Sequence, residues 1–115
     1  SFREAELGLG DLYYLGDGVS QDYQEAYKWF RRAAVHGEPM SCLRISTMYI
    51  KAQGVSQDLV QAYAWLSAHR PKDEATRDKQ RQFLAALETK LSASQLLKAQ
   101  AKADELREEI RSNSK

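Results

Sequence analysis

Apolar residues recur three or four positions apart along most of the chain, and short polar turns rich in glycine separate the apolar stretches. In the first stretch, FREAELGLGDLYYL, this helical spacing is kept by Ala5, Leu9, Leu12 and Tyr13. Gly10 lies inside the same stretch, although a glycine destabilises a helix by roughly 1 kcal/mol relative to alanine. We therefore expect a helix here, with a neighbouring helix approaching closely at Gly10.

The turn GDGVSQD ends this first helix and starts the next one. Gly16 and Gly18 can adopt a positive φ, which a Cβ atom disfavours. Asp22 suits the N-cap of the second helix, and Glu25 follows three residues later as in a capping box. The second helix, YQEAYKWFRRAAVH, is expected to end at Gly37. These signals predict a helix-turn-helix pair over the first third of the chain.

One segment of the chain occurs twice at a constant offset. Residues 18–29 read GVSQDYQEAYKW and residues 54–65 read GVSQDLVQAYAW, so that Trp29 and Trp65 are 36 positions apart. A fixed period of about 20 to 50 residues is typical of a repeat array, whose units stack on one another and present an extended surface. The second unit is expected to begin its first helix at Pro39.

The pattern changes after the second unit. The polar stretch KDEATRDKQRQ followed by FLAALETKL predicts one helix over residues 73–91, and another is expected over residues 93–111. Ser92 and Gln95 form a capping-box pattern at the start of the last helix. This final pair has a polar outer face, as expected of a unit that caps an array.

The first cycle, from Ala5 to Gly37, reads A-x-x-x-L-G-x-x-Y-x-x-G-x-G-V-x-x-D-Y-x-x-A-x-x-W-F-x-x-A-A-x-x-G. This motif resembles the Sel1-like repeat, a relative of the tetratricopeptide repeat with a slightly longer loop between its helices. The tail LSASQLLKAQAKADEL also resembles the closing segment of bacterial Sel1-like proteins. The second cycle departs from the motif at five positions, which are Ser41, Ser46, Ala52, His69 and Arg70. These departures indicate a last repeat that stacks on something other than another standard repeat.

The resemblance implies an all-α fold, a right-handed α-solenoid of antiparallel helix pairs with about six helices. It divides the single domain into a first repeat, a divergent second repeat and a C-terminal capping helix pair, at residues 1–37, 38–71 and 72–115. Members of the family mostly act as scaffolds and adaptors. Bacterial members are frequent in the cell envelope, in secretion and polysaccharide export, and as immunity proteins against secreted toxins. A bacterial, non-catalytic module that binds a protein or peptide is what the resemblance implies.

Composition narrows the class of partner. The net charge of +1 lacks the basic footprint that nucleic acids or anionic membranes require. No apolar run approaches the roughly 20 residues that span a bilayer, and the first residues lack the pattern of a signal peptide. Cys42 is the only cysteine, which fits the bacterial cytoplasm and does not exclude the periplasm or cell envelope.

Few residues of the sequence are candidates for a catalytic, metal-binding or phosphate-binding role. His36 and His69 are the only imidazoles, and neither has a second ligand at metal spacing, so no metal or other cofactor is expected. Gly18 and Gly54 follow no strand and precede no Lys-Ser/Thr pair, which makes them turn glycines rather than a phosphate-binding loop. Cys42 is expected in or near the core, and the two tryptophans are expected to pack. With no clustered titratable residues, an enzyme is not predicted.

The predicted partner site is the first helix of each pair, which lines the concave face in the related tetratricopeptide fold. Apolar residues stand there where a solvated face would be polar, with Tyr14 expected to dominate the binding energy. The stripe comprises Glu4, Leu7, Asp11, Tyr14, Leu15, Met40, Leu43, Thr47, Ile50 and Lys51. In the alternative interpretation, the C-terminal helices fold back and cover these residues.

Other uses stay open at this point. An apolar end at Ala5 and Leu9 would need further repeats or a second copy of the chain, which makes the module one of assembly. The seam formed by Leu96, Leu106 and Ile110 could pair with a helix of another chain. An immunity-type inhibitor of a secreted toxin is a further alternative.

Overall fold

The computed structural model of the protein describes residues 2–113, and six α-helices account for most of them. This confirms the predicted all-α fold. The helices are α1 (Phe2–Leu15), α2 (Tyr23–Val35), α3 (Pro39–Lys51), α4 (Leu59–Ala68), α5 (Glu74–Glu88) and α6 (Ala93–Asn113).

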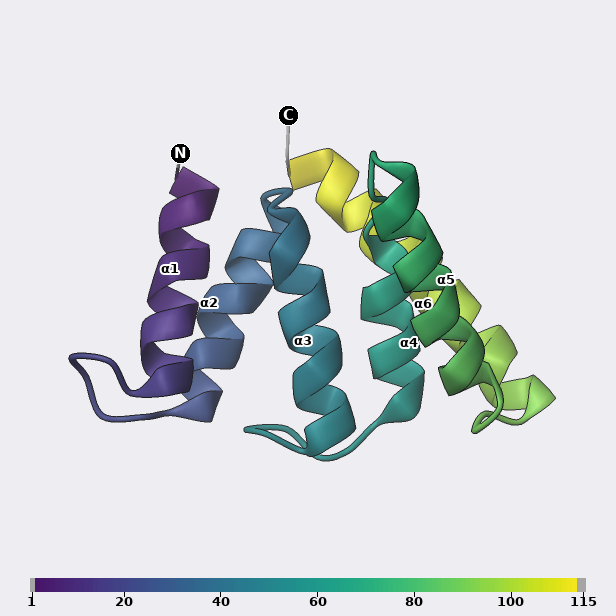
Figure 1. The fold of residues 1–115 in the computed structure, drawn as a ribbon, viewed down its shortest axis with the longest axis horizontal. Helices are drawn as coiled ribbons and strands as arrows, with labels where there is room; N and C mark the ends of the chain where they lie inside the picture. Colours follow the sequence, from purple (N-terminus) through teal and green to yellow (C-terminus); the bar gives the residue numbers. More distant parts are fainter. Residues whose placement is uncertain (1, 114–115) are drawn as a thin grey trace.

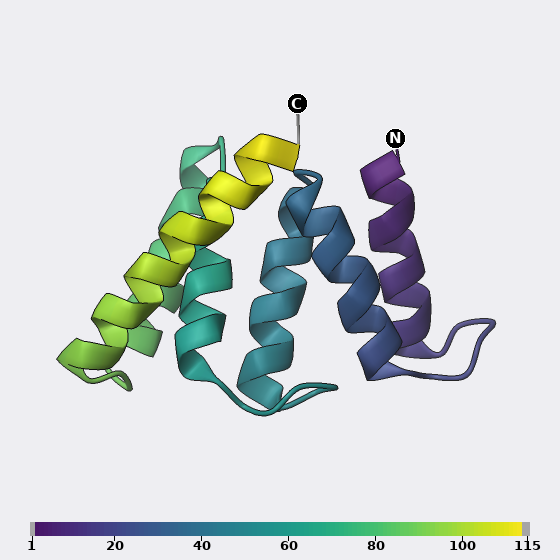
Figure 2. The same ribbon diagram turned by 180° about the vertical axis from the view of Figure 1, so that it is seen from behind.

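The helices form two layers. The first helix of each pair, α1, α3 or α5, lies in the layer nearer the viewer in Figure 1, and α2 and α6 lie behind. Seen from behind, α6 crosses the molecule diagonally, and it packs on α4 and also reaches α2 (Figure 2). Because α6 crosses both of these helices, it closes the core at the C-terminal end of the array.

The two copies of the repeated turn have the same cap. The side chain of Asp22 accepts a hydrogen bond from the backbone N–H of Glu25 at 3.1 Å, and Asp58 caps α4 in the same way. The second half of the predicted capping box at Asp22 is wrong. The backbone N–H of Asp22 donates instead to the carbonyl of Tyr13 at 2.9 Å, and the Glu25 carboxylate pairs with Lys28. The turn thereby ties the start of α2 back to α1.

The second repeat holds a non-glycine residue in left-handed backbone. Gly16 ends α1 with φ +71°, and Ala52, which stands 36 positions later, ends α3 with φ +56°. An L-residue with a Cβ atom is disfavoured in this conformation by roughly 1–2 kcal/mol. The fold therefore imposes the turn geometry of the first repeat on a less suitable residue.

The close helix approach expected at Gly10 is confirmed. A Cβ atom placed on Gly10 would lie 2.5 Å from two carbons of the Phe30 ring, and Phe30 is fully buried. In the second repeat, different residues make the equivalent contact. Ser46 replaces the glycine, and its hydroxyl donates to the carbonyl of Ala62 at 2.8 Å, while Leu66 replaces the phenylalanine.

The two repeated tryptophans differ in burial. Trp65 is 1% exposed and lies in the main core between the first repeat and α6, together with Ala103 and Leu106 of α6. Trp29 is only half-buried, and the guanidinium of Arg32 lies over its ring, 4.9 Å from the centroid. The repeat therefore places both indoles alike, but only the second has a helix packed over it.

The terminal seam is occupied within the chain. Leu106 is buried, Ile110 packs against the main core, and Leu96 packs against a second core cluster with Leu87 of α5. The hypothesis that this seam pairs with a helix of another chain is therefore wrong.

The boundaries of the last pair also differ from the prediction. The helix expected over residues 73–91 ends at Glu88, and the one expected over residues 93–111 extends to Asn113. The reciprocal capping box between Ser92 and Gln95 is confirmed, with N–H···O distances of 2.9 and 3.1 Å.

Candidate partner-binding groove

A groove runs across the layer formed by α1, α3 and α5. It consists of a pocket of about 480 Å³ and an adjoining pocket of about 230 Å³. The two share three lining residues, Leu43, Thr47 and Phe83, so they form one continuous depression. We call this depression the groove. Its larger pocket is lined by Asp11, Tyr14, Leu15, Leu43, Arg44, Thr47 and Phe83.

Two polar contacts connect α1 with the second repeat across the groove. The Arg44 Nε–H donates to Asp11 Oδ1 at 2.9 Å. The Tyr14 hydroxyl donates to Gln53 Oε1 at 2.6 Å, and the Tyr14 ring packs against Phe30. Because these groups satisfy one another, the larger pocket has a polar wall that is already paired beside an apolar one.

The apolar wall is exposed. Leu15 of α1 is 70% exposed and Phe83 of α5 is 59% exposed, and Ile50 of α3 lines the smaller pocket. Large aliphatic and aromatic side chains left accessible in a concave surface are typical of an interaction site. The C-terminal helices thus leave these side chains accessible, although α5 contributes Phe83 to the groove.

The predicted stripe is only partly gathered in the groove. Of its ten residues, six line one pocket or both, which are Asp11, Tyr14, Leu15, Leu43, Thr47 and Ile50. Leu7 packs against the main core, and Glu4 and Lys51 are exposed near the helix ends. Met40 is exposed in the first turn of α3 and lines neither pocket.

Of the residues that line the larger pocket, sequence reasoning missed two, Arg44 and Phe83. Arg44 lies one helical turn from Thr47, and its pairing with Asp11 could not be foreseen without the spacing of α1 and α3. Phe83 is an aromatic residue that follows a long polar stretch on α5. That isolated position was the available signal, but its use depended on where α5 packs.

Two pairs of partly or fully buried polar side chains lie away from the groove, whereas the buried indole N–H of Trp29 has no hydrogen-bond partner among the described residues. Glu6 is almost fully buried, and His36 Nδ1 lies 2.6 Å from its Oε1 atom. The hydroxyls of Tyr27 and Tyr49 are 2.9 Å apart, and burial is the main cause that raises the pKa of Tyr49, with the bond to Tyr27 adding to it. These contacts connect helices and do not converge on a cavity.

Over residues 2–113, no group of three or more His, Cys, Asp or Glu side chains is arranged to hold a metal ion. Nor does any helix within that range have the length and apolar character needed to cross a membrane. The arrangement offers recognition by shape, apolar contact and hydrogen bonds.

Stacked helix pairs with a groove on one face define a helical-repeat protein of the interaction-scaffold class. The family model described as Sel1 repeat matches residues 3–37 and 39–68, which together make up more than half of the chain. The chain therefore belongs to the Sel1 repeat family. Repeats of this family are generally non-catalytic modules that mediate protein–protein interaction.

A solved structure supports the same assignment. The chain is similar to the crystal structure of c5321, a protective antigen present in uropathogenic Escherichia coli strains that displays an SLR (Sel1-like repeat) fold. The TM-score is 0.85 and the sequence identity is 28%. The match covers 97% of this chain and 24% of that one, so the chain spans about a quarter of its length. Comparison with curated proteins gives no match.

Proposed function

We propose that the chain is a scaffold or adaptor module that binds an apolar segment of a protein partner in the groove. The observation that carries this proposal is the exposure of Leu15 and Phe83, which come from α1 and α5 and line the same pocket of one continuous depression. Exposed apolar side chains gain binding energy when a partner buries them, and aromatic residues dominate such interfaces.

The structure refines which residues can test the proposal. Tyr14 contacts Phe30 and Tyr23 and bonds to Gln53, and Leu43 packs against the second core cluster. Truncation of either would disturb the fold as well as binding. Leu15 and Phe83 lack that difficulty because most of their surface is already exposed.

Peptides selected from a displayed random library against the immobilised protein serve as probes. The variant with Leu15→Ser and Phe83→Ser is expected to lose affinity for the selected peptides by about tenfold or more. Leu97→Ser provides the matched control, since Leu97 is 68% exposed on α6 and lines no pocket of the groove. Equal affinity of the double variant and the wild type, or a library without any enriched binder, would reject the groove as the site.

A second candidate function, assembly, is favoured by a different observation. Leu9 and Leu12 of α1 stand 36 positions before Ile45 and Met48 of α3, which are fully buried. On α1 the equivalent residues are substantially exposed, because no helix pair of residues 2–113 packs against that face. A second copy of the chain offers a helix pair of matching character.

Sedimentation equilibrium tests assembly directly. The wild type is expected to form a larger species as its concentration rises to the millimolar range, and Leu12→Glu is expected to remain monomeric. Leu97→Glu, which adds the same charge at another exposed leucine, should behave as the wild type. A wild type that stays monomeric throughout would refute self-association.

A further inference from the structure

The end of α4 departs from the repeat. α2 and α4 begin 36 positions apart, yet α2 has 13 residues and α4 has 10. Pro71 stands at the position of Val35. The residue before a proline, here Arg70, is driven into extended backbone. His69 has φ −83° and ψ 132°, which is already extended. The last turn that α2 completes is therefore missing from α4.

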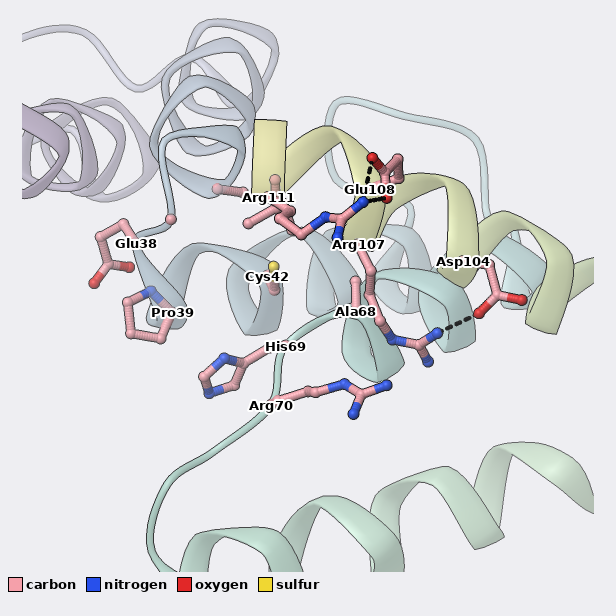
Figure 3. A pocket seen from close by; sticks show the side chains of 13 residues that line it. Glu38, Pro39, Cys42, Ala68, His69, Arg70, Asp104, Arg107, Glu108 and Arg111 are labelled. Carbon is pink, nitrogen blue, oxygen red and sulfur yellow. Dashed lines mark hydrogen bonds and ion pairs between the residues drawn. The ribbon is translucent and has the colours of Figure 1, made fainter. Parts of the chain in front are cut away.

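The missing turn leaves a second hollow, which we call the α4-end pocket (Figure 3). It has a volume of about 430 Å³, within the range of about 300 to 1,000 Å³ that small-molecule sites occupy. It lies between the turn from α2 to α3, the segment that follows α4, and the C-terminal half of α6. Its lining shares no residue with the groove.

The floor of the α4-end pocket is apolar. Ala34, Cys42 and Ala68 are all buried there, and Ile110 of α6 is half-buried beside them. Burial, with a smaller contribution from Glu38, raises the pKa of the Cys42 thiol to about 12. The thiol is thus neutral at ordinary pH, and the floor offers contact surface rather than a nucleophile.

The carboxylates around the pocket already accept hydrogen bonds from other groups of the chain. Glu38 Oε1 accepts the backbone N–H of Ser41 at 2.8 Å and its hydroxyl at 3.2 Å, and so caps α3. One oxygen of this carboxylate and the backbone amide of Ser41 are therefore already engaged with each other.

The acids of α6 are paired in the same way. Asp104 accepts from Arg107, and both oxygens of Glu108 accept from Arg111, at 2.7 and 2.5 Å. Arg107 also donates to the hydroxyl of Ser67 at 3.0 Å, which fixes its guanidinium beside the end of α4. Each acid on this wall is thus neutralised by the arginine one turn further along the helix.

Two cationic donors are left over. Arg70 has no hydrogen-bond or ion-pair partner in the part of the chain that the structure describes, and the buried Nε–H of Arg107 has none either. Figure 3 shows the Arg70 side chain leaving the segment after α4, while that of Arg107 comes from α6. Because buried donors in proteins are almost always satisfied, the Arg107 Nε–H marks a place where an acceptor is missing.

We propose that the α4-end pocket binds a carboxylate carried on a compact aliphatic group. The carboxylate accepts from Arg70 and Arg107, since arginine and carboxylate form short, charge-assisted hydrogen bonds. The aliphatic part covers Ala68 and Cys42. A cationic ligand is disfavoured, because it would meet the unpaired Arg70 and find both acids of α6 paired with arginines. The ligand is either a free carboxylic acid or the C-terminal residue of a peptide.

Titration of the ¹⁵N-labelled protein with N-acetyl-leucine tests the proposal by NMR, with N-acetyl-leucinamide as the uncharged match. Saturable shifts of the Gly37, Ala68 and Arg70 amides are expected with the acid and not with the amide. 4-Methylpentanoate, which lacks the peptide group, separates the two sources. If it binds as tightly as N-acetyl-leucine, the ligand is a small acid; if only N-acetyl-leucine binds, it is a chain end.

Variants connect the binding to the two arginines. Arg70→Gln is expected to lower the affinity for N-acetyl-leucine by about tenfold or more, because it removes charged hydrogen bonds. The position is exposed and does not support the fold. Arg107→Lys keeps the charge but loses the Nε–H, and it should lower the affinity for N-acetyl-leucine as well. Arg81→Gln, on the exposed surface of α5, is the matched control. No saturable shift, equal binding of acid and amide, or unchanged affinity of Arg70→Gln would overturn the proposal.

Discussion

Two glycines in α1 provide a sharp test of how the first repeat is held together. Gly8 and Gly10 are both interior to the helix, so replacement by alanine gains about 0.5–1 kcal/mol of helix propensity at either position. No atom lies within 4 Å of the Cβ added at Gly8, whereas the Cβ added at Gly10 lies 2.5 Å from the Phe30 ring. Carbon atoms normally approach to about 3.5–4 Å, and the buried ring has no free space to enter.

The expected outcome is opposite in sign for the two variants. Gly8→Ala should stabilise the protein by its propensity gain. Gly10→Ala should be destabilised relative to it by about 1–3 kcal/mol, the usual range for overpacking a core. Because the substitution and the helix are the same, propensity cancels in the comparison, and the difference isolates the steric conflict with Phe30.

Urea unfolding followed by circular dichroism gives the free energy of unfolding of each variant. A further variant, Phe30→Leu in the Gly10→Ala background, should recover much of the loss, because the second repeat already pairs Ser46 with Leu66. Equal stabilisation by Gly8→Ala and Gly10→Ala would refute the reasoning. So would an additive effect of the two changes at positions 10 and 30, since contacting residues should couple.

Three other outcomes follow from the repeat and its exceptions. Ala52→Gly should raise the free energy of unfolding by up to about 1 kcal/mol, while Gly16→Ala should lower it, because both positions have left-handed backbone; two changes of the same sign in urea titrations would contradict this. Trp65→Ala should lower the free energy of unfolding by about 3–5 kcal/mol, and Trp29→Ala should lower it less, because only Trp65 is fully buried. Similar losses in the two variants would contradict this difference between the sites. Burial lowers the pKa of His69 despite an opposing contribution from Glu38, so the unfolded chain takes up its proton first as the pH falls through 6.5. The wild type should then lose more stability between about pH 7.5 and pH 5.5 than His69→Gln does, and parallel pH profiles of the two proteins would contradict the assignment.

The repeated turns were predictable because their signals are local. An acidic N-cap such as Asp22 or Asp58 acts on amides two or three residues away, and a positive φ at Gly16 depends on the absence of its own side chain. Ala52 shows the limit of this local reasoning. There the rest of the repeat outweighs the intrinsic preference of one residue, which the pattern alone could not establish.

The groove and the α4-end pocket were not predictable to the same degree, because both depend on how α4 ends. Pro71 indicates a helix boundary, but the direction in which the chain continues is set by packing of α5 and α6. Phe83 enters the groove, and Arg107 reaches the end of α4, only as a result of that packing. The same reason explains the buried pair of Glu6 and His36, in which a charged residue of α1 lies on the core side of its helix.

The contacts that bound the groove differ in how much stability depends on them. Asp11 and Arg44 are each about one-third exposed, and ion pairs of that kind contribute roughly 0–1 kcal/mol. Phe83 is mostly exposed and supports little of the core. Gly10 and Phe30, by contrast, set the distance of α1 from α2, and α2 in turn packs on α3. A scaffold of this design can change the chemistry of the groove without unfolding, because specificity and stability depend on separate residues. Substitutions that alter the partner are therefore expected at Asp11, Arg44 and Phe83, and substitutions that alter the shape of the groove at Gly10 and Phe30.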